Sequence, residues 1–378
     1  MIRMKIKDIC DLQNGRAFKP SDWGTAGVPI IRIQNLNDER APFNYYSGKY
    51  NLAQEVDNGD LLFSWSGTPG TSFGAFLWNR GKGVLNQHIF KVIPKVEVDK
   101  TYLMYALNGN ISTIISKAHG GVGLQHITKK ELDEIEIQMV SISRQKKIVE
   151  ILEKISLLIF LRKQQIAKLD ELVKARFVEM FGDPVNNPMN YPKSQLGKVC
   201  DVRDGTHDSP EYYDVGYPLV TSKNVTGGKI DLSECNLISE DDYKKICERS
   251  KVDRGDIIMP MIGTVGKPVI VNAEPMFAIK NVALIKFTPD SLVTNIYIKT
   301  LLESDYFDRA VLDKIRGGTQ KFIALGDIRK LEIILPDLKH QQCFSAFVER
   351  VDQQKQTVQQ SLEKLELMKK ALMQEYFG

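Results

Sequence analysis

Residues that could carry out catalysis do not occur at catalytic spacings in this sequence. A phosphate-binding loop needs Gly, four residues, Gly-Lys and then Ser or Thr. The segment GTVGKP at 263–268 lacks the first Gly at that spacing and has Pro268 where the magnesium-binding hydroxyl belongs. An amino-methyltransferase motif needs Asn or Asp followed by Pro-Pro and an aromatic residue, and neither DPV at 183–185 nor NPM at 187–189 provides it. We therefore do not expect nucleotide binding or methyl transfer by the chain itself.

The acidic and histidine residues also do not form a metal-binding pattern. A restriction-type nuclease holds magnesium with Pro-Asp followed by Glu-x-Lys, but no Glu-x-Lys follows Pro289-Asp290 or Pro336-Asp337. The five histidines show no metal-ligand spacing; they are His88, His119, His126, His207 and His340. The sequence thus predicts no catalytic residue, no metal site and no cofactor of the chain's own.

The side chains left to do chemistry are polar residues in predicted loops. Arg, Lys, Asn and Gln match the edges of guanine and adenine in the major groove, and Lys, Ser and Thr also bind phosphates. Any one alone could be a solvated loop residue, so the prediction concerns the set. In the first half the candidate DNA-binding residues are Arg16, Arg32, Gln34, Asn35, Ser64, Ser66, Thr68, Asn86, Gln87, His88, Gln125 and His126. In the second half they are Thr206, His207, Ser222, Lys223, Asn224, Thr264, Lys267, Lys280, Asn281, Gln320 and Lys321.

Two long predicted helices would position these loops. Residues 141–182 have an apolar heptad seam, with Ser141 or Ser143 as a cap and Gly182 before Pro184 as a stop. About forty residues at ~1.5 Å rise would make a rod of roughly 60 Å, which needs a partner helix to cover its apolar stripe. The seam consists of Ile148, Leu152, Ile155, Ile159, Ile166, Leu169 and Val173.

The partner is predicted in residues 338–378 of the same chain. Its seam aligns with the first after a shift of 196 residues, the difference between Phe344 and Ile148. Charged breaks in one seam, Arg162 and Arg176 or Lys355 and Lys369, align with apolar residues of the other, so we expect each helix to fill the other's gaps. The second seam consists of Phe344, Val348, Val351, Val358, Leu362, Leu365 and Leu372.

The segments that precede the helices repeat as well. VDNGDLLFSWSGTPG at 56–70 and VDRGDIIMPMIGTVG at 252–266 share seven of fifteen residues at the same shift. In each segment, short apolar runs start after a Gly-Asp turn and read as strands, and a helix is predicted at 102–117 and at 297–315. The chain is therefore expected to be a tandem repeat of α+β domains with mixed sheets, each followed by a long helix.

Composition restricts the class of protein further. A chain of 378 residues is too long for one ordinary core, so two domains are expected. The five cysteines form no CxxC pair, which favours reduced thiols in a cytoplasm. No apolar run approaches the ~18 residues of a membrane span, and the start lacks a signal-peptide core. The net charge of +4 permits nucleic acid as a partner without requiring it.

With these features the chain resembles the specificity subunit of Type I restriction–modification enzymes. The resemblance covers essentially the whole sequence. It rests on the segments RQKKIVEILEKI and LDELVKARFVEMFGDPVNNP, on their echoes HQQCFSAFVERV and LEKLELMKKALMQEYFG, and on the repeated Gly-Asp strands at 59–68 and 255–264. The resemblance implies target recognition domains at 1–140 and 183–337, and conserved long helices at 141–182 and 338–378 that pack antiparallel with pseudo-two-fold symmetry.

The family's function would follow from this architecture. Each recognition domain would read one half of a bipartite site in double-stranded DNA, while the helices set the spacing and bind methyltransferase subunits, two of them in the family. Restriction and translocase subunits complete the enzyme, and S-adenosylmethionine, ATP and magnesium belong to those partners. The chain itself would be a non-catalytic subunit.

Three alternatives remain open on sequence alone. The chain could serve a related restriction–modification enzyme outside Type I, be a self-sufficient nuclease or methyltransferase, or be a coiled-coil scaffold. The target bases, the spacer length, the residues that contact bases and the oligomeric state of the free subunit do not follow from the sequence.

Overall fold

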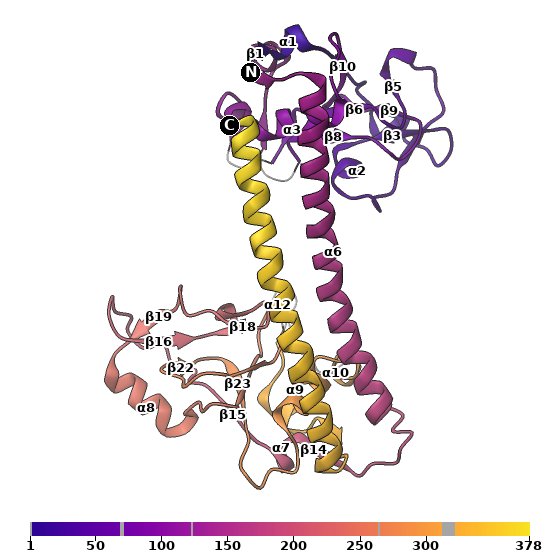
Figure 1. The fold of residues 1–378 in the computed structure, drawn as a ribbon. Helices are drawn as coiled ribbons and strands as arrows, with labels where there is room; N and C mark the ends of the chain where they lie inside the picture. The colour runs from indigo at the N-terminus through magenta and orange to yellow at the C-terminus, as the bar shows by residue number, and fades with distance from the viewer. Residues whose placement is uncertain (1, 69–71, 122–123, 264, 312–321) are drawn as a thin grey trace. The chain divides into compact units, whose positions relative to one another are not determined.

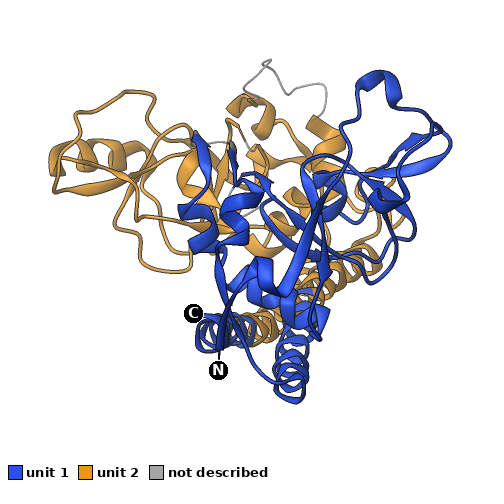
Figure 2. Cartoon of the chain, turned by 90° about the horizontal axis from the view of Figure 1, so that it is seen from above, with its two compact units in different colours: residues 1–163, 360–378 blue, residues 164–359 orange. Residues whose placement is uncertain are grey.

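The computed structural model describes residues 2–68, 72–121, 124–263, 265–311 and 322–378. The chain forms two compact units, of which the first combines two separate segments and the second is one continuous segment (Figure 2). Unit 1 is Met1–Lys163 with Gln360–Gly378, and unit 2 is Gln164–Gln359. Among the described residues no helix is long and apolar enough to cross a membrane.

The described residues of unit 1 form small sheets, one of them mixed, and five short α-helices (Figure 1). Its central sheet is antiparallel, in the order β2 (Cys10–Asn14), β10 (Ile89–Pro94), β6 (Leu61–Ser64) and β8 (Gly74–Leu77). A second sheet, with β3 parallel to β9, has the order β4 (Asn44–Tyr46), β3 (Val28–Ile31), β9 (Gly83–Leu85) and β5 (Glu55–Val56). Two further sheets are β1 (Ile2–Lys5) with β13 (Glu136–Met139), and β11 (His119–Gly121), β12 (Leu124–His126) and β7 (Ser66–Gly67). The helices are α1 (Ile6–Ile9), α2 (Ile33–Asn37), α3 (Lys100–Gly109), α4 (Ile111–Ser116) and α5 (Lys129–Asp133).

Unit 2 repeats the central sheet, the parallel pair and the two-stranded sheet of β1 and β13. Its central antiparallel sheet has the order β15 (Asp201–Asp204), β23 (Val282–Lys286), β20 (Ile257–Pro260) and β21 (Val269–Ile270). A parallel pair recurs between β16 and β22, in the order β19 (Asn236–Ile238), β16 (Tyr217–Val220) and β22 (Ala278–Ile279). Two small sheets are β14 (Lys193–Gln195) with β24 (Glu332–Ile334), and β17 (Val225–Thr226) with β18 (Lys229–Ile230). The helices are α7 (Leu196–Val199), α8 (Glu240–Ser250), α9 (Asn295–Leu302), α10 (Asp305–Val311) and α11 (Leu325–Arg329). The expected duplicated α+β fold with mixed sheets is confirmed.

The repeated VDxGD motif builds the turn that precedes the central strand of each unit. The carboxylate of Asp256 accepts hydrogen bonds from the backbone N–H of Asp253 (2.8 Å) and from Lys286 Nζ on the neighbouring strand β23 (2.6 Å). In unit 1, Asp60 pairs in the same way with the N–H of Asp57 and with Lys91 Nζ on β10. The glycine of each motif has a positive φ, which favours residues without a Cβ. The motif is therefore structural in both units.

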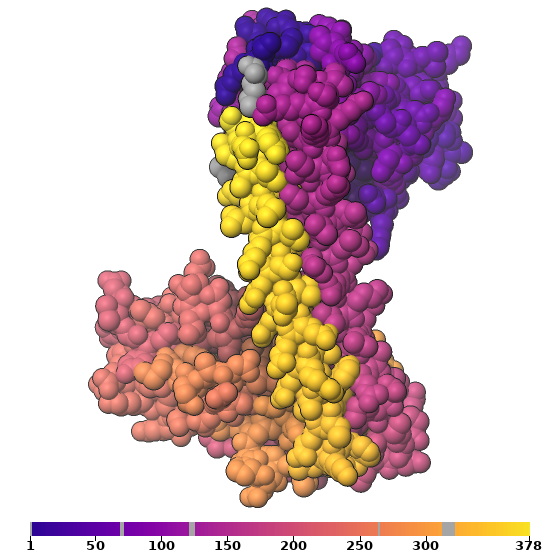
Figure 3. Space-filling model, viewed as in Figure 1, coloured from indigo at the N-terminus to yellow at the C-terminus, as the bar shows by residue number. Residues whose placement is uncertain are grey.

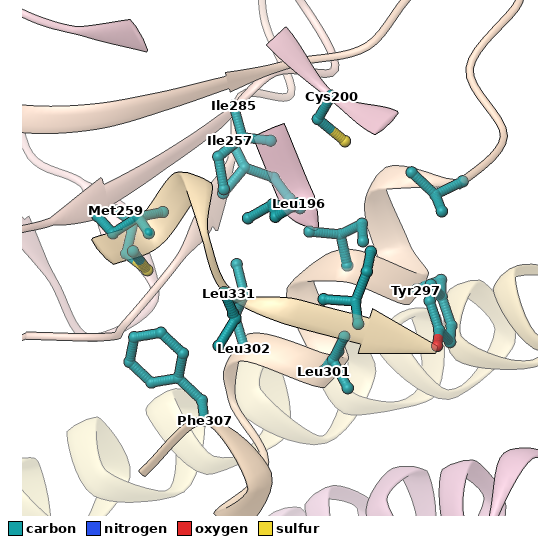
Figure 4. Close-up of a cluster of buried hydrophobic side chains, with 14 of the residues drawn as sticks. Leu196, Cys200, Ile257, Met259, Ile285, Tyr297, Leu301, Leu302, Phe307 and Leu331 are labelled. Carbon is teal, nitrogen blue, oxygen red and sulfur yellow. The ribbon is translucent and has the colours of Figure 1, made fainter. Parts of the chain in front are cut away.

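One hydrophobic core lies in unit 2, where the helices α7 and α9 pack on the central sheet (Figure 4). Tyr297 on α9 is fully buried and donates a hydrogen bond to the carbonyl of Ile334 (2.9 Å). Unit 1 has the equivalent contact from Tyr102 on α3 to the carbonyl of Gln138 (2.7 Å), and burial raises the pKa of Tyr102 to about 12. Apolar neighbours in Figure 4 are Leu196, Cys200, Ile257, Met259, Ile285, Leu301, Leu302, Phe307 and Leu331.

The two long helices are α6 (Ile142–Phe181) and α12 (Leu338–Phe377), each of 40 residues. Each contributes to both units, so each unit contains the start of one helix and the end of the other. In unit 1 the last turns of α12 lie against the first half of α6 (Figure 3), and Lys163 Nζ binds Glu366 at 2.8 Å. In unit 2, Lys355 Nζ binds Asp170 at 2.5 Å. The helices are therefore antiparallel within each unit, as expected.

The predicted seam residues are all buried or half-buried. Nine are buried, namely Ile148, Leu152, Ile155, Leu169, Phe344, Val348, Val351, Val358 and Leu362. Ile159, Ile166, Val173, Leu365 and Leu372 are half-buried. The expectation that a charged residue of one seam meets the apolar residue aligned with it in the other seam was wrong. Aligned residues occupy equivalent positions in the two units. Arg176 belongs to unit 2 and lies over the ring of Phe347 (5.8 Å), whereas its aligned residue Leu372 belongs to unit 1.

The starts of the two long helices are bound to the units by equivalent hydrogen bonds, and the end of α12 is bound by an aromatic contact and a hydrogen bond. At the start of α6, Gln145 accepts from the N–H of Asp99 and donates to the carbonyl of Val140, and Gln341 makes the equivalent pair of bonds in unit 2. At the end of α12, Phe377 packs on Tyr102 (5.3 Å) and accepts a bond from Asn110. The close approach requires a glycine at position 109, since a Cβ there would lie 2.5 Å from Phe377. The helix expected at 102–117 is interrupted at the next residue, Asn110, which separates α3 from α4.

Candidate nucleic-acid interface

In each unit three chain segments meet at a point that we call the crossing: residues 15–16, 31–32 and 85–86 in unit 1, and residues 205–206, 220–221 and 279–280 in unit 2. Arg16 forms a parallel bridge with Asn86, and Thr206 forms one with Lys280. A glycine permits both approaches, because a Cβ on Gly15 would lie 2.1 Å from the carbonyl oxygen of Asn86 and one on Gly205 would lie 2.2 Å from that of Ile279. The repeated Gly in QNGRAF and RDGTHD therefore brings predicted polar residues of separate loops together.

Two arginines at the crossing of unit 1 are held by aromatic rings. The guanidinium of Arg16 lies 4.8 Å from the ring centroid of Tyr46 and donates to the carbonyl of Lys49 (2.8 Å). That of Arg32 lies 4.7 Å from the ring centroid of Trp23 and donates to Asn44 Oδ1 (3.2 Å). Stacking on an aromatic face leaves the donors at the guanidinium edge, which suits them to phosphates or guanine.

A second polar group in unit 1 surrounds Trp65. The ring of His88 lies 5.3 Å from that of Trp65, and His88 Nε2 is 3.1 Å from Gln87 Nε2. His88 Nδ1 and Gln125 Oε1 are buried and have no hydrogen-bond partner among the residues that the structure describes. Burial lowers the pKa of His88, which keeps the ring neutral near pH 7. Buried polar atoms without partners are uncommon, and these two could hydrogen-bond a ligand.

The crossing of unit 2 is built from different side chains. His207 places Nδ1 2.8 Å from Asn281 Oδ1 and Nε2 2.8 Å from Asp204 Oδ2. Asn281 has a φ of 55°, in the left-handed region that Asn tolerates. Lys280 Nζ donates to Ser209 Oγ (2.6 Å). Ser222 Oγ is 3.5 Å from the carbonyl oxygen of Asn281, which brings a third loop to the same place.

This pair of bonds predicts a pH dependence of unit 2. Hydrogen bonds to Asn281 and Asp204 raise the pKa of His207, because protonated imidazole donates from both nitrogens. A histidine whose pKa is higher in the folded state than in the unfolded state stabilises the protein fully at a pH below its unfolded-state pKa. This stabilisation is lost as the pH rises through the folded-state pKa. We expect the free energy of unfolding of unit 2, measured in urea, to fall by less than about 1 kcal/mol between pH 6 and pH 8. The effect is small because the His207 side chain is mostly exposed. His207→Gln should remove the slope, and an unchanged slope in that variant contradicts the assignment.

Four predicted residues do not belong to this surface. Asn35 and Asn224 are 2% and 9% exposed, and their side-chain oxygens accept the N–H of Arg32 and Thr221. Ser64 and Ser66 are also buried, and Ser64 Oγ donates to the carbonyl of Ser66. Their polar atoms serve the interior, so the expectation that they contact DNA is corrected.

The remaining predicted residues lie outside the two groups of contacts described above. Gln34, Thr68, His126, Lys223 and Lys267 are exposed. Gln34 and Lys223 occupy equivalent positions, each directly before a buried Asn. Thr264, Gln320 and Lys321 lie outside the described residues.

Sequence analysis missed Trp23, Trp65 and Arg80. The indole of Trp65 packs on Phe90 and His88 and donates to Asn14 Oδ1 (3.2 Å). A basic residue beside a glycine in a loop, as in WNRGK at 78–82, was a signal that could have identified Arg80. In the described part of the chain no group of three His, Cys, Asp or Glu side chains could hold a metal ion.

Comparisons with known proteins agree on one family. The model of the Type I restriction modification DNA specificity domain matches residues 3–171 and 188–367. The EcoBI specificity subunit of a Type I restriction enzyme from Escherichia coli is 22% identical and covers 93% of this chain and 78% of its own length. The MjaVIII specificity subunit from Methanocaldococcus jannaschii is 25% identical and covers 84% of this chain and 78% of its own length.

Solved structures share the fold at low sequence identity. The S subunit of a Type I restriction–modification system from M. genitalium aligns with a TM-score of 0.58 at 15% identity, over 100% of this chain and 96% of that one. A chain from a structure on complex assembly and conformational transition of the type I R-M system aligns with a TM-score of 0.60 at 15% identity, over 100% and 97%. These similarities extend over both repeats and both long helices.

Proposed function

The chain belongs to the Type I restriction modification DNA specificity domain family, and on that premise we propose that it is the DNA-recognition subunit of a Type I restriction–modification enzyme. Each unit would recognise one half of a bipartite target in double-stranded DNA. The crossings would supply side chains to bases and phosphates, and α6 and α12 would set the number of unread base pairs between the half-sites.

One observation supports this proposal most strongly. The two units repeat the same central sheet and the same glycine-dependent crossing, but they carry different polar residues there. Unit 1 offers Arg16, Arg32 and Asn86, whereas unit 2 offers Thr206, His207 and Lys280. A repeated frame with different polar groups suits two readers of different short sequences, because specificity comes from the pattern of donors and acceptors.

The reaction would belong to partner subunits. We propose that methyltransferase subunits bind the helix faces outside the seam, where α6 exposes Leu157, Leu158, Phe160 and Leu161. Charged residues normally dominate such a face, and contiguous exposed apolar side chains mark protein contacts. S-adenosylmethionine, ATP and magnesium would act on the methyltransferase and restriction subunits, in the cytoplasm, and this chain would contribute recognition without catalysis.

The proposal is tested by sequencing methylated adenines in a host that expresses this chain with its methyltransferase partner. We expect two short specific sequences separated by a constant number of unspecified bases. The purified complex should bind that duplex, and the affinity should fall at least about 1,000-fold between 50 and 200 mM salt if six or more phosphates are contacted. A duplex with one half-site scrambled is the control. A continuous methylated sequence, or methylation by this chain alone, contradicts the proposal.

A further inference from the structure

Arg80, in the turn after β8, connects several parts of the segment from Arg32 to Asn44. Its Nη1 donates to the carbonyl oxygens of Asn35 (3.3 Å) and Asp38 (3.4 Å), and its Nη2 donates to that of Ala41 (3.1 Å). The guanidinium therefore bonds the end of α2 and the turn that follows it. These carbonyls lie where a helix leaves acceptors without partners of its own.

Aromatic rings fix the guanidinium in this position. Its carbon lies 4.1 Å from the ring centroid of Phe43 and 5.9 Å from that of Trp78. Trp78 is 3% exposed and donates from Nε1 to the carbonyl of Gly81 (2.6 Å), which ties the ring to the turn that carries Arg80. Because its donors point at backbone carbonyls and its face is covered by Phe43, Arg80 is placed to support other residues.

The segment that it supports carries candidate readers. Arg32 precedes α2 and is stacked on Trp23, and Gln34 is exposed on α2. With only five residues, α2 has little stability of its own. Asn35 holds the segment from the inside by donating to the carbonyls of Ala41 and Pro42. Arg80 bonds the same turn at the carbonyl of Ala41. Gln34 Nε2 donates to the carbonyl of Pro42 in that turn (3.4 Å), so the orientation of Gln34 depends on how the turn is held.

Unit 2 closes the equivalent segment without an arginine. Asn224, the equivalent of Asn35, has its carbonyl oxygen bonded by the backbone N–H of Asp231 (2.8 Å). The next residues form the hairpin of β17 and β18. In unit 1 the equivalent carbonyl, that of Asn35, is bonded by the side chain of Arg80.

We propose that Arg80 is a positioning residue for DNA recognition by unit 1. It holds residues 32–44 so that Arg32 and Gln34 keep the geometry needed to contact bases. This inference rests on the proposed function, and it concerns one half-site only.

The test compares Arg80→Met with Lys82→Met in the complex with methyltransferase. Lys82 lies in the same turn, its side chain is 69% exposed, and it forms a 3.4 Å ion pair with Glu55, so it controls for loss of one charge. For each complex, affinity is measured for the mapped target and for duplexes with single base changes. Arg80→Met should lower discrimination at one half-site by about 10-fold, comparable to one bidentate base contact. In Arg80→Met, discrimination at the half-site read by unit 2 should stay within about twofold of that of the unsubstituted complex. That half-site is identified by Lys280→Ala, which should weaken discrimination there.

Arg80→Lys separates positioning from folding. Lysine keeps the charge but lacks the planar fork and the stacking face, so we expect partial recovery of discrimination. If Arg80→Met does not fold, Arg80→Lys tests the inference, through its loss of discrimination at the half-site read by unit 1 relative to that at the other half-site. Unchanged discrimination at both half-sites, or an equal loss at both, overturns the inference. Absence of any bipartite methylation by the unsubstituted complex overturns the proposed function, and this inference with it.

Discussion

Removal of one heptad from each long helix is expected to change the spacer of the DNA target and leave its half-sites unchanged. Residues 167–173 of α6 and 352–358 of α12 lie opposite each other in unit 2, as the Lys355–Asp170 pair indicates. Deleting both keeps the alternation of three and four in each seam, so the remaining contacts keep their register. Each helix shortens by about 10 Å, which corresponds to roughly three base pairs of DNA.

Methylation of the original target should then fall at least about 30-fold. Each mismatched base pair costs about 1–3 kcal/mol, so loss of even a two-base half-site costs about 2–6 kcal/mol. The measurement is methylated-adenine sequencing in the host, which reports the new spacer directly. The length-preserving pair Gln164→Ala and Gln360→Ala, both exposed, serves as the control. Retention of the original spacer by the shortened protein would falsify the role of the helices in spacing.

The long helices were predictable because their signal is local and periodic. The seam residues of α6 and α12 repeat at heptad spacing over forty residues, and the observed helices span 142–181 and 338–377. The strands after each Gly-Asp turn were predictable for the same reason, since the apolar runs directly follow a turn. Repetition of both signals at one shift made the duplicated fold predictable.

The side chains at the candidate interface were less predictable because burial depends on distant segments. Asn35 looks like a base reader in sequence, but residues 41, 42 and 80 enclose it or bond its backbone. Asn86 and Arg16 come together only because Gly15 admits a second strand. The contacts of Asn35 with Arg80 and of Arg16 with Asn86 join residues 45 and 70 positions apart, and periodicity carries no information about them.

The sequence pattern also does not predict that each long helix ends in the other unit. The endings EMFG and EYFG are visibly alike, but the sequence does not say which unit receives each one. The structure assigns Phe181, the last residue of α6, to unit 2 and Phe377, the last residue of α12, to unit 1. Each long helix therefore starts on the unit that precedes it and ends in the core of the other, which makes the two cores depend on both helices.

Phe181→Ala is therefore expected to destabilise unit 2 by about 4 kcal/mol, as is typical for truncation of a buried aromatic ring. The side chain is fully buried, and its ring centroid lies 5.1 Å from those of Phe177 and Tyr297 and 5.4 Å from that of Phe344. Its removal takes away contacts to α9 and to the start of α12 at once. The measurement is the free energy of unfolding in urea, with hydrogen exchange to locate the effect.

Phe160→Ala is the matched control on the same helix. Phe160 is 54% exposed, so its truncation should change the free energy of unfolding by less than about 0.5 kcal/mol. In Phe181→Ala, amides of α9 and β24 should lose protection while those of α3 in unit 1 keep it, because Phe377 still packs on Tyr102 there. Equal effects of the two substitutions, or loss of protection in α3 first, would mean that the end of α6 does not anchor unit 2.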